Sequence, residues 1–338
     1  CGSSGQIKGY LYDVKFWNGT TSTSDTPTKE ITFANTLTAK PYLMVLSHSI
    51  NSGSIGNGLR YNGDSGSNYA NGYSNDGGSN SNFTSQTNIV TSDGYSSDIF
   101  QTDFIMNKSD QEKIGNGHIV AQNATGAGTA PRRTEYGSKW ANTSDSITSV
   151  NLIQTDSGDY ASGSEVVVLG YDPDDTEGTS VWEELKSVEL GSAASSLDTG
   201  SFTSKKYLWI QFAGVGSNAS SYPRLRFNGV TGNEFAYRQN VNGGSDNTQT
   251  TQNHINTSGD VGAVNHYFNA FVINKSDKEK LVIIEGVDSN TAGAGNAPKR
   301  RETVGKWTST SAQISSIQVV DIGGHNFSSA SLTVWGFD

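Results

Sequence analysis

The stretch that decides the fold is Leu225-Arg226-Phe227-Asn228-Gly229, because Leu59-Arg60-Tyr61-Asn62-Gly63 repeats its pattern 166 residues earlier. Each copy ends on Asn-Gly, a pair that favours a tight turn between two strands. Further segments correspond at nearly the same offset, which predicts one module of about 165 residues present twice. They are Tyr42 to Val45 with Tyr207 to Ile210, Asn107 to Asp110 with Asn274 to Asp277, Lys139-Trp140 with Lys306-Trp307, and Gly170 to Asp172 with Gly336 to Asp338.

An acidic, turn-rich segment, Asp172-Pro173-Asp174-Asp175-Thr176-Glu177-Gly178, lies between the two copies. Its composition is that of a linker. We therefore predict a first β-sandwich module at residues 1–173, an acidic linker at 174–179 and a second β-sandwich module at 180–338.

Within each module the apolar residues alternate with polar ones or form short runs such as Val166 to Leu169, and clusters of Gly, Asn and Ser separate them. These are the patterns of strands and turns. Seven or eight strands a module predict an all-β protein of two tandem, jelly-roll-like sandwiches that arose by internal duplication. The segment from Ser180 to Leu190 departs from this pattern. Its apolar residues stand at helical spacing behind a capping-box sequence, which predicts a short helical turn before a strand.

The composition excludes several classes of protein. The 338 residues carry 23 basic against 33 acidic side chains, for a net charge of −10, and a single cysteine. An acidic chain without a basic block predicts no nucleic-acid partner, and the lack of any run of 18 apolar residues predicts no membrane span. One cysteine cannot form an internal disulfide. Because the strong apolar residues are few and divided between two modules, we expect assembly contacts to add stability.

No pattern of catalytic residues stands out, so we predict a non-enzymatic protein without a cofactor. The histidines lack metal-ligand spacing and are expected to be isolated surface or loop residues. Gly63-Asp64-Ser65-Gly66 resembles a protease nucleophile turn, but its counterpart, Gly229-Val230-Thr231-Gly232, lacks both the acid and the serine, so a tight turn explains it. The alternative for the acidic linker is a calcium site, with ligands from Asp172, Asp174, Asp175 and Glu177.

The most specific repeated constellation runs from Gly126 to Trp140 and from Gly293 to Trp307. On a strand, Arg133, Glu135 and Lys139 share one face and the tryptophan takes the other. This predicts either an ionic ladder on a wet face above a core tryptophan, or a contact surface for a neighbouring subunit or an acidic glycan. The basic candidates for that contact are Arg132, Arg133, Lys139, Lys299, Arg300, Arg301 and Lys306.

Two long Asn-, Gly- and Ser-rich segments follow the Asn-Gly turns and carry several aromatic residues. Exposed aromatics beside amide side chains are typical of glycan-binding and antibody-like surfaces. We therefore predict long loops here and add their aromatics to the candidate contacts, namely Tyr69, Tyr73, Phe235 and Tyr237.

The Leu-Arg-Phe-Asn-Gly turn and the segment from Ala161 to Asp172 resemble the duplicated β-sandwich structural proteins of tailed bacteriophages, especially marine ones. In those proteins the turn often continues as Asp-Thr-Gly and an aromatic residue. Here it continues as Asp64-Ser65-Gly66 or Val230-Thr231-Gly232, so neither copy matches throughout. The resemblance covers nearly the whole chain, and it implies a virion protein of tail, tail fibre or head surface, with no catalytic residues.

The resemblance implies other virion proteins and further copies of this chain as partners, and a host-surface glycan as a ligand. One expected function is a tail-fibre, receptor-contacting protein, and another is a head-decorating protein. A double jelly-roll capsid shell protein remains an alternative. So does a carbohydrate-binding bacterial surface lipoprotein, because Cys1 begins a Cys-Gly-Ser-Ser-Gly stretch that suits either a lipidated cysteine or ordinary processing.

Overall fold

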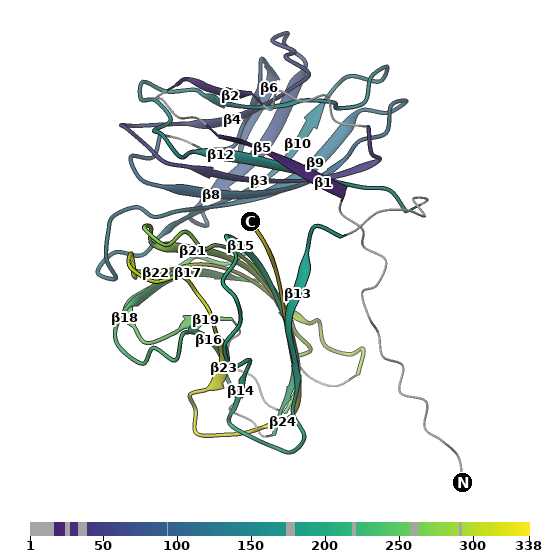
Figure 1. Cartoon of the computed structure of the whole chain (residues 1–338). Coiled ribbons are helices and arrows are strands. Elements are labelled where there is room, and N and C mark those ends of the chain that lie inside the picture. The colour runs from purple at the N-terminus through teal and green to yellow at the C-terminus, as the bar shows by residue number, and fades with distance from the viewer. Residues whose placement is uncertain are drawn as a thin grey trace.

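The computed structural model describes residues 17–23, 28–32, 39–92, 94–173, 180–217, 221–257, 263–290 and 293–338. Within these ranges every regular element is a β-strand, and the strands form four sheets (Figure 1). The all-β prediction is therefore confirmed. The described residues contain no helix with the length and hydropathy of a membrane span.

The first sandwich is formed by strands β1 to β12. Its eight-stranded sheet has the order β1-β12-β3-β8-β9-β10-β5-β6, and its four-stranded sheet has the order β2-β11-β4-β7. The strands are β1 Trp17–Thr23, β2 Glu30–Thr32, β3 Tyr42–Ser49, β4 Asn57–Tyr61, β5 Tyr69–Asn75, β6 Ser81–Gln86, β7 Ile89–Val90, β8 Ile99–Met106, β9 Lys113–Ala121, β10 Arg132–Trp140, β11 Val150–Gln154 and β12 Glu165–Tyr171.

The second sandwich is formed by strands β13 to β24. Its large sheet has the order β13-β24-β15-β20-β21-β22-β17-β18, and its small sheet has the order β14-β23-β16-β19. The strands are β13 Glu183–Glu189, β14 Ser196–Asp198, β15 Tyr207–Gly216, β16 Pro223–Phe227, β17 Phe235–Val241, β18 Asn247–Gln252, β19 Ile255–Asn256, β20 Asn265–Ile273, β21 Lys280–Asp288, β22 Lys299–Trp307, β23 Ile317–Asp321 and β24 Phe327–Phe337.

Adding twelve to each strand number of the first sandwich reproduces the sheet orders of the second. Strand β9 thus corresponds to β21, β10 to β22, and β5 to β17. The described residues of each half contain twelve strands, so the prediction of seven or eight was wrong. It was low because β5, β6, β17 and β18 lie in the polar segments that we expected to be loops.

Each sandwich has its own apolar core between its large and small sheets. Trp140 and Trp307 lie in these cores, at 1% and 2% exposure, as the alternation along β10 and β22 predicts. Their indole Nε1 groups donate to Asp64 at 2.7 Å and to Glu234 at 3.0 Å. Asp64 is therefore a structural acceptor beside the turn after β4, where Gly63 has a φ of 66°.

A third apolar cluster lies between the two sandwiches. It takes residues from the faces of both large sheets that are turned away from the small sheets. Val166 and Val168 point into the first core, whereas Val167 and Leu169 enter this third cluster. Both faces of β12 are buried, which is why its sequence is a continuous apolar run.

The prediction of a helical turn after Ser180 was wrong, because the segment enters strand β13 at Glu183. Strand β13 pairs with β24, and the register shifts between Glu184 and Lys186. Leu185 is the extra residue of this bulge. The bulge breaks the period of two and produces the spacing that imitates a helix.

Gly117 in β9 shows how tightly the inner side of the first large sheet is packed. A Cβ atom there would lie 2.3 Å from Cζ of Tyr136 and 2.5 Å from Oδ1 of Asp103. We expect Gly117→Ala to lower the free energy of unfolding by about 1–3 kcal/mol, because buried overpacking costs this much. Urea unfolding would measure the change. Gly137→Ala is the matched control, since its Cβ meets no atom within 4 Å, and an equal loss in both variants would contradict the prediction.

Candidate functional site

The two large sheets meet face to face, and β9 and β21 lie at the centre of the contact (Figure 1). Positions that correspond in the two sandwiches face each other there. His118 is the sixth residue of β9 and Glu285 the sixth residue of β21. The Nδ1 atom of His118 lies 2.6 Å from Oε1 of Glu285. Phe104 and Phe271, likewise corresponding, have ring centroids 5.9 Å apart. The contact is therefore close to two-fold symmetric along its central line.

Arg133 links the sandwiches through a buried ionic network. Its side chain is 1% exposed, and its Nη1 lies 3.0 Å from Glu135 and 2.8 Å from Glu302. Its Nη2 and Nε donate to the two carboxylate oxygens of Asp246 at 2.9 and 3.3 Å. One guanidinium of the first sandwich therefore holds two carboxylates of the second. Such forked contacts are the strongest that arginine makes.

The packing changes the pKa values of the groups in this network. Burial opposes the charging of His118, but its contacts with the carboxylates of Glu135 and Glu285, at 3.8 and 2.6 Å, outweigh it and raise the pKa of the imidazole to about 9. Burial, and then the neighbouring Glu135 carboxylate, raise the pKa of Glu302 to about 7. The contact with His118 holds the pKa of Glu135 well below its usual range. Glu135 is therefore ionised near neutral pH, whereas Glu302 is protonated in part of the molecules.

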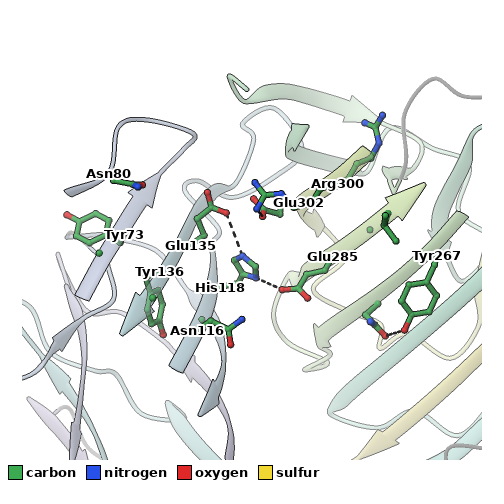
Figure 2. Close-up of a pocket in the computed structure, with 17 residues that line it drawn as sticks. Tyr73, Asn80, Asn116, His118, Glu135, Tyr136, Tyr267, Glu285, Arg300 and Glu302 are labelled. Carbon is green, nitrogen blue, oxygen red and sulfur yellow. Dashed lines mark hydrogen bonds and ion pairs between the residues drawn. The ribbon is translucent and has the colours of Figure 1, made fainter. Parts of the chain in front are cut away.

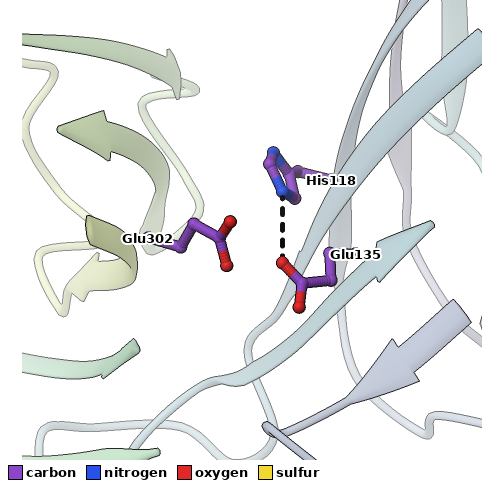
Figure 3. A group of neighbouring side chains, drawn as sticks. All are labelled: His118, Glu135 and Glu302. Carbon is purple, nitrogen blue, oxygen red and sulfur yellow. Dashed lines mark ion pairs between the residues drawn. The ribbon is translucent and has the colours of Figure 1, made fainter. Parts of the chain in front are cut away.

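His118, Glu135 and Glu302 form a group of possible metal ligands (Figure 3). One ligand atom from each lies within 4.8 Å of the others, and histidine with two carboxylates suits a divalent cation. However, the Arg133 guanidinium already contacts both carboxylates and Glu285 already holds Nδ1 of His118. A dication would have to displace an arginine, so these side chains fit the packing of the two sandwiches better than metal binding.

One side of the central line is closed by ion pairs between the sandwiches. Glu165 of the first sandwich lies 2.8 Å from Nζ of Lys206 and 3.0 Å from Nζ of Lys275 of the second. Arg238 of the second sandwich lies 3.2 Å from Asp76 and donates to the carbonyl of Pro131 at 3.0 Å. These contacts hold the sandwiches together on that side.

The opposite side is open, and a cleft of about 620 Å³ lies there between the sheets (Figure 2). On the closed side Arg133 contacts Asp246. The corresponding residues on the open side are Arg300, which matches Arg133, and Asn80, which matches Asp246. Arg238, which bridges the closed side, corresponds to Gly72 in the wall of the cleft. Because Gly72 and Asn80 stand here in place of two charged side chains, this side of the contact is unfilled. Its wall includes Gly72, Tyr73, Asn80, Asn116, His118, Glu135, Gly137, Tyr267, Asn269, Glu285, Val287, Arg300 and Glu302.

The structure places three of the seven predicted basic residues in buried positions and four at the surface or partly exposed. Arg133, Arg301 and Lys306 are buried. Arg133 and Lys306 belong to the predicted wet ionic ladder, so that prediction is wrong at these two positions. Burial follows because the second sandwich covers Arg133, and the Gln122 to Ala127 loop of the first sandwich covers Lys306. The other four reach the surface to different degrees: Arg132 pairs with Asp76, Lys139 with Glu112 and Arg300 with Glu302, and Lys299 is partly buried.

The predicted exposure of four aromatic residues was wrong. Tyr69, Tyr73, Phe235 and Tyr237 are between 0% and 6% exposed, because they lie on the inner faces of β5 and β17. Of these only Tyr73 also lines the cleft. The aromatic residue that the cleft does expose is Tyr267 at 41%, which lies in β20.

The histidines also differ from the expectation of isolated surface or loop residues. His48, His254 and His266 are buried, and His118 forms the central contact. In each of the three, burial lowers the pKa of the imidazole. For the calcium hypothesis, Asp174, Asp175 and Glu177 lie outside the described residues, and Asp172 alone is described.

Comparisons with known proteins do not assign this chain to a family. No family model matches it, and no curated protein matches it. Among solved structures, domains LG4-5 of the mouse laminin alpha1 chain are 12% identical, over 95% of this chain and 90% of that one, with a TM-score of 0.21. An acyl-CoA hydrolase from Agrobacterium tumefaciens is 8% identical over 66% and 77% of the two chains, with a TM-score of 0.13. Likenesses with TM-scores this low carry no conclusion.

Proposed function

We propose that this chain is a non-enzymatic structural protein of a tailed-bacteriophage particle, and that it contacts the host receptor, a surface glycan, through the cleft between its two sandwiches. The observation that carries the proposal is the cleft itself. It is about 620 Å³ in volume and is lined by tyrosine, asparagine and arginine side chains from both sandwiches. A concave site with convergent polar groups is the usual form of a ligand site.

The arrangement of the two sandwiches supports a binding role. We infer that they are jelly-roll-like copies of one duplicated module, since their strand orders correspond throughout. The shared apolar cluster and the Arg133 network hold them together. Preorganised walls lower the entropy lost on binding. Of the carboxylates that line the cleft, Glu135 and Glu302 are held by Arg133 and Glu285 by His118, so we assign them to this packing and not to hydrolysis.

A head-decorating protein is the second candidate, favoured by an apolar surface on the first large sheet. Tyr42, Phe104 and Ile114 are 40%, 38% and 52% exposed and line one groove beside the contact with the second sandwich. Exposed apolar patches mark surfaces that another protein covers. A homo-oligomer or a capsid subunit would supply that cover.

Immunogold electron microscopy of purified particles, with antibody against this protein, tests the virion proposal. Label at the tail tip is expected for the receptor-contacting protein, and label over the head would instead support the decorating protein. Absence of label from every particle would overturn both.

The glycan part of the proposal is tested separately, on the purified chain. We expect Gly137→Phe to weaken binding to the host's surface polysaccharide at least tenfold, because this residue stands at the cleft wall with open space above it. Biolayer interferometry would measure the affinity. Gly191→Phe, which adds the same ring at an exposed position outside the cleft, should leave it unchanged. Equal affinity of Gly137→Phe and the unaltered chain would contradict the proposal.

A further inference from the structure

Arg133 and Arg300 hold the same position, the second residue of β10 and of β22, but their surroundings differ. Arg133 is 1% exposed and grips the carboxylate of Asp246 with two nitrogens. Arg300 is 58% exposed and stands at the wall of the open cleft. The residue corresponding to Asp246 is Asn80, on the opposite wall (Figure 2). The closed side of the contact thus pairs its arginine with a carboxylate, whereas the open side has an amide at the position that corresponds to this carboxylate.

The acidic residues of the cleft are already paired. Glu285 is held by His118, and Oε2 of Glu302 is held by Arg133. Arg300 itself uses Nη1 for a contact of 3.1 Å with Oε1 of Glu302. A guanidinium has five N–H donors, so this contact leaves several for a ligand. An anion that enters the cleft therefore meets an exposed arginine and carboxylates that are already neutralised.

The wall opposite the first sandwich carries an aromatic ring beside amide groups. Tyr267 is 41% exposed. Oδ1 of Asn269 accepts hydrogen bonds from Tyr267 at 3.1 Å, from Gln211 at 2.8 Å and from Trp209 at 3.2 Å. These three donors fix the orientation of the amide and turn its Nδ2 away from them. Asn116 is exposed on the facing wall. A fixed ring with neighbouring amides suits the apolar face and the hydroxyl groups of a sugar.

We propose that the cleft binds an acidic saccharide, with its carboxylate or sulfate on Arg300, its hydroxyl groups on Asn116 and Asn269, and a sugar ring against Tyr267. This inference rests on the proposed receptor-contacting function and specifies the class of glycan. The planar carboxylate and the tetrahedral sulfate share the chemistry that arginine recognises, because each presents a pair of anionic oxygens to paired N–H donors. The net charge of the chain is −10, so overall attraction does not favour acidic ligands, and a preference for them would report on the cleft.

The test measures affinities of the full chain for three oligosaccharides by isothermal titration calorimetry. The probes are hexagalacturonate for the carboxylate, sulfated maltohexaose for the sulfate and neutral maltohexaose. We expect at least one acidic probe to bind ten or more times more tightly than the neutral one. Arg300→Gln should weaken acidic binding about tenfold, as expected for the loss of a charge-assisted contact, and should leave neutral binding unchanged.

Arg132→Gln is the matched control, since Arg132 also pairs with a single carboxylate, that of Asp76, has a 40% exposed side chain and lies outside the cleft wall. An equal loss in Arg132→Gln and Arg300→Gln would show diffuse charge attraction and overturn the inference. Binding blocked by Gly137→Phe but unaffected by Arg300→Gln would overturn the inference and keep the proposed glycan contact. Failure of all three probes to bind would overturn the inference, and probe binding unaffected by Gly137→Phe would overturn the proposed glycan contact as well.

Discussion

Replacing Arg133 with methionine is expected to destabilise the chain by about 3–5 kcal/mol, because removing one partner of a buried ionic network leaves the others charged and desolvated. The lost guanidinium contacts Glu135 and Glu302, and it grips Asp246 with two nitrogens. Methionine fills much of the space of the arginine's aliphatic chain, so the change in stability reports mainly the loss of the guanidinium charge. Because two of the three carboxylates belong to the second sandwich, we also expect the sandwiches to separate, which small-angle X-ray scattering would detect as a larger radius of gyration.

Arg300→Met is the control that the chain itself offers. It removes the same side chain from the corresponding position of β22, where the arginine is 58% exposed and pairs with a single glutamate. Exposed ion pairs contribute less than about 1 kcal/mol, so this variant should unfold within that margin of the unaltered chain. Similar losses in both variants, or an unchanged radius of gyration in Arg133→Met, would show that the network does not hold the sandwiches together.

This difference between two arginines marks the limit of what the sequence predicts. Alternation along β10 correctly places Trp140 in a core, and the Asn-Gly pair correctly places the turn after β4. Both are local signals, because a strand alternates its faces and a turn needs particular dihedral angles. Whether the outer face of β10 is wet depends on what packs against it, and the second sandwich does so through residues more than a hundred positions away.

A comparison of the two halves of the sequence finds charged residues that one half lacks. Arg238 corresponds to Gly72, and Asp246 to Asn80. These differences indicate that one side of a symmetric contact is closed and the other is open, but only once the contact is known. The aromatic residues show the opposite error. Tyr69 and Tyr73 are four residues apart and therefore share one face of a strand, but the surrounding glycines and asparagines suggested an exposed loop.

Raising the pH from 7 to above 9 is expected to weaken the contact between the sandwiches, through deprotonation of His118. Its pKa is about 9 in the folded chain, against about 6.5 in an unfolded one. The protonated imidazole therefore contributes stability in full below pH 6.5, and this contribution, about 3 kcal/mol, is lost as the pH rises through 9. Glu302, with a pKa of about 7, acts in the same direction, since its stabilising proton is lost between about pH 4.5 and 7.

The free energy of urea unfolding, measured from pH 6 to 10 for the unaltered chain and for His118→Gln, separates this contribution from others. The variant lacks the titrating ring, so its stability should fall less over the window from 6.5 to 9. His325→Gln, at a partly exposed position on the second sandwich, should keep the slope of the unaltered chain. The buried imidazoles of His48, His254 and His266 have lowered pKa values and act in the opposite sense, since they cost stability only as the pH falls below 6.5. If the free energy of unfolding of His118→Gln falls with pH as steeply as that of the unaltered chain, other groups cause the loss at alkaline pH. His118 would then not be the charge that joins the two sheets.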